Sequence, residues 1–172
     1  MSEKIKKFHQ SSIDSTDEFW AEQAKLIHWN SSFEQVLDYS NPPFAKWFVQ
    51  GKTNLCFNAI DRHLDERSDQ AAIVYVSTET NAEESISYKE LFQRVNSFSS
   101  LLSSCGVSKG DRVLIYMPMI PEAVYAMLAC VRIGAVHSVV FGGFASASLA
   151  QRVDDCSPKV MVTADAGLRG GR

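Results

Sequence analysis

The chain has 172 residues, of which 45% are hydrophobic and 22% charged, and its formal net charge is -3 at pH 7. This composition is typical of globular proteins and excludes a collagen, a coiled coil or a disordered chain. The negative balance argues against nucleic-acid binding through a basic face. The charge is uneven, because residues 1–86 carry 8 Lys and Arg against 14 Asp and Glu, whereas residues 87–172 carry 9 against 6. An anionic ligand is therefore expected to bind within residues 87–172 and not within residues 1–86.

The cysteines and the longest apolar segment bear on the cellular location. The four cysteines are far apart and have no histidine at metal-ligand spacing, so we expect reduced thiols. The longest apolar run covers residues 123–131, well short of the roughly 20 residues that cross a bilayer. The N-terminal residues lack the apolar core of a signal peptide. We expect a cytoplasmic protein with no membrane partner.

The first 66 residues are predicted to form a helical and irregular layer. Ser15 and Glu18 have the spacing of a capping box, followed by apolar residues at helical spacing. Asn41-Pro42-Pro43 interrupts regular structure. The predicted elements are a helix over 15–29, an irregular segment over 33–51 and a helix over 54–67.

From residue 71 the pattern alternates between strands and helices. Ser87 and Glu90 form a second capping box, Pro121 suits a first helical turn, and Gly134 suits a helix end. Short apolar strands separated by helices indicate right-handed βαβ crossovers. The fold class is therefore α/β, with the first βαβ units of a doubly wound, mostly parallel sheet after the helical layer. The predicted strands are 71–77, 85–87, 112–116, 136–141 and 159–163, and the predicted helices between them begin at Ser87, Pro121 and Ser146.

Three loops should meet at one edge of this sheet, because open parallel sheets bind ligands beyond the carboxyl ends of their strands. These loops are residues 118–122, 142–146 and 164–172. Gly142 and Gly143 lie between a strand and a helix N-terminus, where backbone N–H groups favour an anion. The loop lacks the GxGxxG and GxxxxGK[ST] patterns, so a plain tight turn explains it as well.

The last four residues, Arg169-Gly170-Gly171-Arg172, place two guanidinium groups three positions apart with small residues between them. On a helix both would lie on one face and could bind a phosphate bidentately. Such a pair is also common on solvated helices. Pattern alone therefore indicates an α/β domain with a candidate anion site.

Three long segments of the chain are distinctive: NPPFAKWFVQGKTNLCFNAIDRH at 41–63, RVLIYMPMIPEAVYAMLACVRIGAVHSVVFGGF at 112–144 and TADAGLRGGR at 163–172. They closely resemble the N-terminal part of the AMP-forming short-chain acyl-CoA synthetases, and the resemblance covers nearly the whole chain. Residues 40–48 and 51–62 are more similar to members that activate propionate than to those that activate acetate.

The resemblance implies a ligase that activates a short-chain carboxylate with ATP to an acyl-adenylate and transfers the acyl group to CoA. It implies that residues 1–66 are the N-terminal segment of acetyl-CoA-synthetase type and that residues 67–172 begin the large AMP-binding domain. It also assigns CoA contacts to the residues matching Arg169, Gly170, Gly171 and Arg172, and with weaker support to those matching Phe141, Gly142 and Gly143.

The family's phosphate loop, adenine segment, acyl pocket and catalytic lysine have no match here. We therefore expect no catalytic residue and no Mg²⁺ ligand among these residues, although Mg²⁺ is expected with ATP. Residues 1–172 alone should be inactive and should need the rest of the ligase chain. The alternatives are an acetate-activating ligase and a non-catalytic CoA-binding or partner module. An unrelated Rossmann-like domain is disfavoured by the missing GxGxxG.

Overall fold

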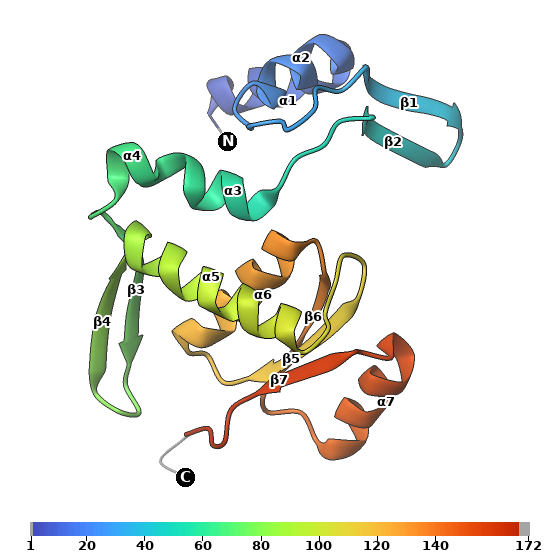
Figure 1. Ribbon diagram of the computed structural model, residues 1–172. Coiled ribbons are helices and arrows are strands. Elements are labelled where there is room, and N and C mark those ends of the chain that lie inside the picture. Colours follow the sequence, from blue (N-terminus) through green and yellow to red (C-terminus); the bar gives the residue numbers. More distant parts are fainter. Residues whose placement is uncertain (1, 169–172) are drawn as a thin grey trace. The chain divides into compact units, whose positions relative to one another are not determined.

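The computed structural model describes residues 2–168, and the chain divides into two compact units at the boundary between Asn54 and Leu55. The first unit contains two helices followed by an antiparallel hairpin (Figure 1). Its packing is largely aromatic, since Trp29, Phe33 and Phe48 contact one another with ring centroids 5.1–5.3 Å apart. The elements of this unit are α1 (Glu3–Asp14), α2 (Thr16–Ala24), β1 (Gln35–Asn41) and β2 (Phe44–Val49).

The predicted capping box at Ser15 and Glu18 is wrong. The helix is shorter than predicted, Thr16–Ala24, and Ser15 makes no side-chain cap hydrogen bond. The unpredicted helix α1 comes directly before it, and the Ser15 N–H donates to the Ser11 carbonyl at 3.1 Å. Ser15 therefore ends α1, and its backbone (φ -134°, ψ 59°) differs from the extended conformation of most N-caps.

The prediction of an irregular segment over 33–51 is also wrong, because residues 35–49 form the β1–β2 hairpin. Leu37 pairs with Trp47 in an antiparallel register. Pro42 and Pro43, joined by a cis peptide, fall in the turn between the strands. A proline outside the paired residues removes no ladder hydrogen bond, so the two prolines end the strands without preventing the hairpin.

The second unit begins with a broken helix, not the continuous one predicted over 54–67. Its pieces are α3 (Leu55–Ala59), a 3₁₀ turn η1 (Asp61–His63) and α4 (Leu64–Arg67). The break falls at Ile60, whose φ of -126° and ψ of -67° are not helical. The Ile60 side chain is fully buried, so core packing is maintained across the break.

The first strand of the hairpin that follows and the long helix after it confirm the sequence predictions, whereas the second strand begins at Ala82 and not at residue 85 as predicted. Strand β3 (Ala71–Ser77) pairs antiparallel with β4 (Ala82–Ser87). Helix α5 (Tyr88–Ser104) starts with the predicted capping box: the Glu90 N–H donates to Ser87 Oγ at 3.2 Å, and the Ser87 N–H donates to Glu90 Oε2 at 2.8 Å. Two donors of the first turn are thereby satisfied.

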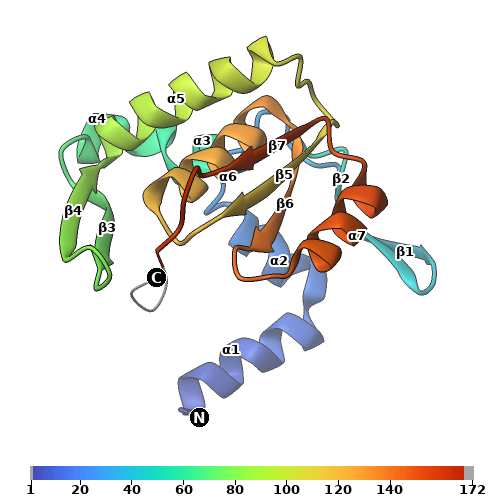
Figure 2. The same cartoon turned by 90° about the horizontal axis from the view of Figure 1, so that it is seen from below.

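The remaining elements form a three-stranded parallel sheet in the order β6–β5–β7. Helices α5 and α6 lie over one face and α7 lies on the opposite face (Figures 1 and 2). The chain thus winds outward in one direction from β5 to β6 and returns across the sheet to β7, as predicted for a doubly wound sheet. These elements are β5 (Arg112–Met117), α6 (Pro121–Ile133), β6 (Val136–Phe141), α7 (Ser146–Cys156) and β7 (Val160–Thr163).

The ends of α6 and α7 follow the sequence signals to different degrees. Pro121 is in the first turn of α6, and Gly134 ends that helix with a left-handed φ of 75°, as predicted. The predicted cap at Ser146 is wrong, because Ala145 is the N-cap of α7 and supplies no side-chain bond. Ser146 is instead the first helical residue.

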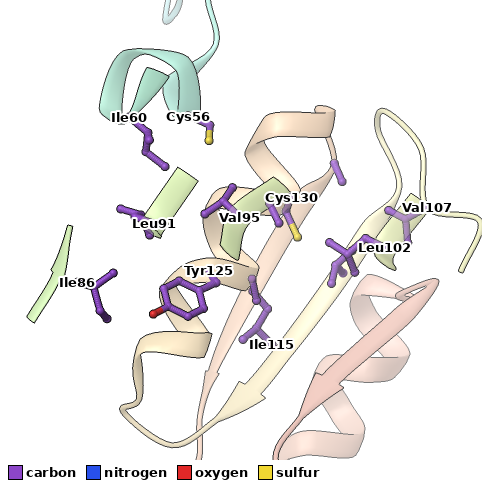
Figure 3. Close-up of a cluster of buried hydrophobic side chains, with 14 residues drawn as sticks. Cys56, Ile60, Ile86, Leu91, Val95, Leu102, Val107, Ile115, Tyr125 and Cys130 are labelled. Carbon is purple, nitrogen blue, oxygen red and sulfur yellow. The ribbon is translucent and has the colours of Figure 1, made fainter. Parts of the chain in front are cut away.

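The main core lies between α5, α6 and one face of the sheet (Figure 3). Val95 and Leu102 of α5 face Cys130 of α6 and Ile115 of β5, and all four are essentially inaccessible to solvent. Burying side chains of this size contributes about 1.5–3 kcal/mol each. This core fixes the direction of β5 and thus the position of its carboxyl end.

Candidate functional site

A cavity of about 490 Å³ opens at the carboxyl ends of the three parallel strands. Its walls are residues 116–119 after β5, 141–143 after β6 and 163–168 after β7. The connection after β5 leads to α6 on one face of the sheet, and the connection after β6 leads to α7 on the other (Figure 2). Connections that diverge in this way leave a crevice between neighbouring strands, which is the usual ligand site of an open α/β sheet.

All three loops that the sequence predicted at this edge contribute to the cavity. Pro118 and Met119 come from the first loop, Gly142 and Gly143 from the second, and residues 164–168 from the third. Residues 120–122 and 144–146, also expected here, do not line it. The sequence therefore located this edge of the sheet correctly.

Gly142 lies where the ends of two strands approach each other closely. A Cβ atom at this position would lie 3.0 Å from the Met117 carbonyl oxygen and 3.4 Å from the Met117 carbonyl carbon. Both are backbone atoms of the neighbouring strand, so they cannot rotate away as a side chain would. Backbone packing thus accounts for this glycine before any ligand is considered.

The polar groups of the cavity are few. The Asp165 carboxylate accepts a hydrogen bond from the Ala166 N–H at 2.9 Å, and the Tyr116 hydroxyl lies 3.1 Å from the Gly142 carbonyl oxygen. No lysine or arginine within residues 2–168 lines the cavity. Much of the wall is apolar, with Met119 and Phe141 85% and 52% exposed. Such a wall suits a flat or apolar ligand group, and a phosphate would need cations from outside this set.

The site residues expected from the sequence fall into two groups. Phe141, Gly142 and Gly143 all lie on the wall formed after β6. The segment 169–172, which contains both expected arginines, lies outside the described residues. Leu168, the residue directly before it, is part of the wall.

Tyr116 and Thr163 line the cavity but were not singled out from the sequence. Both belong to short, mostly apolar strands, and burial in a parallel sheet alone accounts for such a pattern. The register that pairs Tyr116 with both Val140 and Thr163 exists only in the folded sheet. A polar-tipped residue near the carboxyl end of a central strand is the one clue that was available.

The fold and the cavity thus define an α/β protein with a candidate ligand site at the switch point of its sheet. Comparison with known families narrows this class. Residues 60–170 match the family described as AMP-binding enzyme, and residues 5–59 match the family described as acetyl-coenzyme A synthetase N-terminus. The chain belongs to the AMP-binding enzyme family.

Individual relatives agree with this assignment. The chain is 56% identical to propionate–CoA ligase of Escherichia coli (strain K12) over 96% of its own length. It is 48% identical to acetyl-coenzyme A synthetase of Methylorubrum populi over 98% of its length. The structure of acetoacetyl-CoA synthetase from Streptomyces lividans superposes with a TM-score of 0.89 at 32% identity, over 95% of this chain and 25% of that one. This chain spans 26% of the length of each of the first two relatives.

Two further features concern metals and membranes. Among residues 2–168, three or more His, Cys, Asp or Glu side chains nowhere come together as a metal site. No helix in the described part of the chain is both long and apolar enough to cross a bilayer.

Proposed function

We propose that these residues form the N-terminal part of a short-chain fatty acid–CoA ligase that acts on propionate. The 56% identity to a propionate–CoA ligase carries this proposal. In the proposed reaction, a propionate oxygen attacks the α-phosphorus of ATP and diphosphate leaves. The CoA thiolate then attacks the acyl carbon, and AMP leaves. The products are propionyl-CoA, AMP and diphosphate.

Within that ligase we propose that the cavity after β5, β6 and β7 receives the nucleotide end of CoA. Its apolar wall suits an adenine ring, and the glycines at 142 and 143 permit close approach of a ligand. Arg169 is joined by one peptide unit to Leu168, which lines the cavity. A guanidinium group on the residue that directly follows the wall suits bidentate binding of a phosphate. We further propose the division into residues 1–66 and 67–172 that the resemblance implies.

The test of the acid uses the product of the complete reading frame. We expect AMP release that depends on CoA, with kcat/KM higher for propionate than for acetate. A higher kcat/KM for acetate would mean that the ligase activates acetate by the same reaction. If the product binds CoA tightly but releases no AMP when the acid is added, the protein is a non-catalytic CoA-binding module and not a ligase. Residues 1–172 alone are expected to release no AMP.

A test of the CoA site uses Arg169→Ala in the same full-length product. Loss of a phosphate contact should raise the KM for CoA about tenfold, because a charge-assisted hydrogen bond contributes about 1.5–3 kcal/mol. The KM for ATP should change less than twofold. Arg94→Ala on the exposed surface of α5 is the matched control. If the KM for CoA changes equally in the two variants, Arg169 is not part of the CoA site.

A further inference from the structure

Tyr116 connects the central strand to the turn that follows β6. Its side chain extends from the next-to-last residue of β5, and its hydroxyl lies 3.1 Å from the Gly142 carbonyl oxygen and 3.2 Å from the Phe144 carbonyl oxygen. A phenol has one proton, so it donates to one of these carbonyls at a time or is shared between them. The two carbonyls belong to the residues on either side of Gly143, so one hydroxyl contacts the backbone both before and after this glycine.

The far end of the same turn is attached to α7. The Phe144 N–H donates to the Phe141 carbonyl at 3.1 Å, and the two rings meet edge to face with centroids 5.8 Å apart. The Arg152 guanidinium lies over the Phe144 ring, 4.5 Å from its centroid. Arg152 is itself held by the Ser148 carbonyl and hydroxyl at 2.8 and 2.6 Å. The Phe144 side chain is therefore fixed independently of Tyr116.

These contacts leave one specific task for the hydroxyl. Gly142 and Gly143 have no side chains that could restrain their backbone, yet both line the cavity. The Tyr116 hydroxyl supplies the polar contact between the end of β5 and the carbonyls on either side of Gly143. Without it, the turn would lose its donor from the sheet and would sample more conformations.

We propose that Tyr116 is a positioning residue for CoA, acting through the turn at residues 142–144. This inference rests on the proposed function, in which the turn forms part of the CoA nucleotide site. Tyr116 pre-organises the glycine wall before the ligand arrives, so the ligand does not have to order it. Loss of the Tyr116 hydroxyl should therefore weaken the binding of CoA and not that of ATP or of the acid.

The experiment compares Tyr116→Phe with wild type in the product of the complete reading frame. Phenylalanine keeps the ring and removes only the hydroxyl. We expect the KM for CoA to rise about 3- to 10-fold, the loss that one hydrogen bond represents, while kcat and the KM for ATP change less than twofold. Hydrogen exchange of the peptide that covers residues 142–145 should be faster in the variant. Tyr39→Phe, at an exposed position of β1, is the control and should change neither quantity.

Each outcome decides a separate statement. Unchanged exchange together with an unchanged KM for CoA overturns the positioning role. A raised KM for CoA with unchanged exchange also overturns it, and would make the hydroxyl a direct ligand contact. If the wild-type product shows no CoA-dependent turnover, the proposed function fails, and the exchange measurement still decides whether Tyr116 orders the turn. A melting temperature equal to that of Tyr39→Phe excludes general unfolding as the cause.

Discussion

Arg132 of α6 and Asp61 of η1 form a bidentate ion pair between segments 71 positions apart in the chain. The Nη1–Oδ1 distance is 2.9 Å and the Nη2–Oδ2 distance is 2.7 Å, and the side chains are only 20% and 18% exposed. The Arg132 guanidinium also lies over the Phe92 ring of α5, 5.2 Å from its centroid. The Arg132 side chain of α6 thus contacts both η1, in the broken helix of the second unit, and α5.

Removing one partner of this pair should be costly. We expect Asp61→Asn to lower the free energy of unfolding by about 2 kcal/mol, because it leaves a largely buried guanidinium without its countercharge. The exposed pair Lys6–Glu3 is the control, and Lys6→Met should cost less than about 0.5 kcal/mol. Urea unfolding of each variant gives the values. The double variant Asp61→Asn, Arg132→Met should lose much less stability than the sum of the losses of the two single variants. A loss equal to that sum would contradict the coupling between the two residues.

The two serine capping motifs of the sequence should respond differently to the same substitution. Ser87→Ala removes an acceptor for the Glu90 N–H and should destabilise the protein by about 1 kcal/mol. Ser15→Ala removes no side-chain cap bond and should change the stability by less than about 0.3 kcal/mol. Hydrogen exchange of the first-turn amides of α5 and α2 separates the two effects. Equal losses at both serines would be inconsistent with the observed caps.

Gly142→Ala tests the close contact between strand ends. The new Cβ would meet the Met117 backbone at 3.0 Å, so the turn must shift, and we expect a loss of about 1–2 kcal/mol in urea unfolding. Gly167→Ala on the opposite wall is the matched control. Its Cβ would lie 3.6 Å from the Pro118 side chain, an ordinary contact, so stability should change by less than about 0.5 kcal/mol. A neutral Gly142→Ala would mean that the turn is looser than described.

Asp111 should contribute to stability in a pH-dependent way. Hydrogen bonds from the Ser108 backbone N–H, from Lys159 and from the Ser108 hydroxyl lower the pKa of this carboxyl to about 2. A pKa that is lower in the folded than in the unfolded state gives a contribution that is complete above pH 4 and is lost as the pH falls toward 2. Asp111→Asn should therefore flatten the fall of stability between pH 4 and pH 2. An unchanged acid profile would exclude this linkage.

The cysteines should differ widely in reactivity. Burial raises the pKa of the Cys130 thiol to about 11 and also raises that of Cys56, and both side chains are inaccessible to solvent. Cys105 is exposed. With iodoacetamide at pH 8 we expect Cys105 to be labelled first, and Cys130 only after unfolding, because the thiolate is the reactive form. Peptide mass spectrometry after timed quenching identifies the order, and early labelling of Cys130 would contradict its burial.

The sequence predicted those parts of the fold in which local signals and tertiary packing agree. Strand β6 is predicted with its observed ends, because its mainly β-branched and aromatic segment lies between Gly134 and Gly142. The break at Ile60 could not be predicted, since Ile60 continues the helical spacing of the apolar residues around it although its backbone is not helical. The sequence does not predict the β1–β2 hairpin, because two adjacent prolines are typical of a break in regular structure and the local pattern does not show that they form a turn between paired strands.

The candidate site was predictable in position but not in detail. The rule that ligands bind beyond the carboxyl ends of parallel strands located three of its loops before any coordinates. The contact between Tyr116 and the turn after β6 spans 26 positions and depends on strand register, which the local pattern does not contain. The close approach behind Gly142 is likewise a property of two neighbouring backbones.

The strand order β6–β5–β7 also has a consequence for how the protein is made. The ribosome releases the middle strand first, so β5 leaves the exit tunnel with neither neighbour available. β6 can pair on one side as soon as α6 has emerged, but the other side of β5 stays open until α7 and β7 have been translated. The three walls of the cavity therefore come together only at the end of this stretch of synthesis. A ligand could recognise the nascent chain at this edge only after that moment.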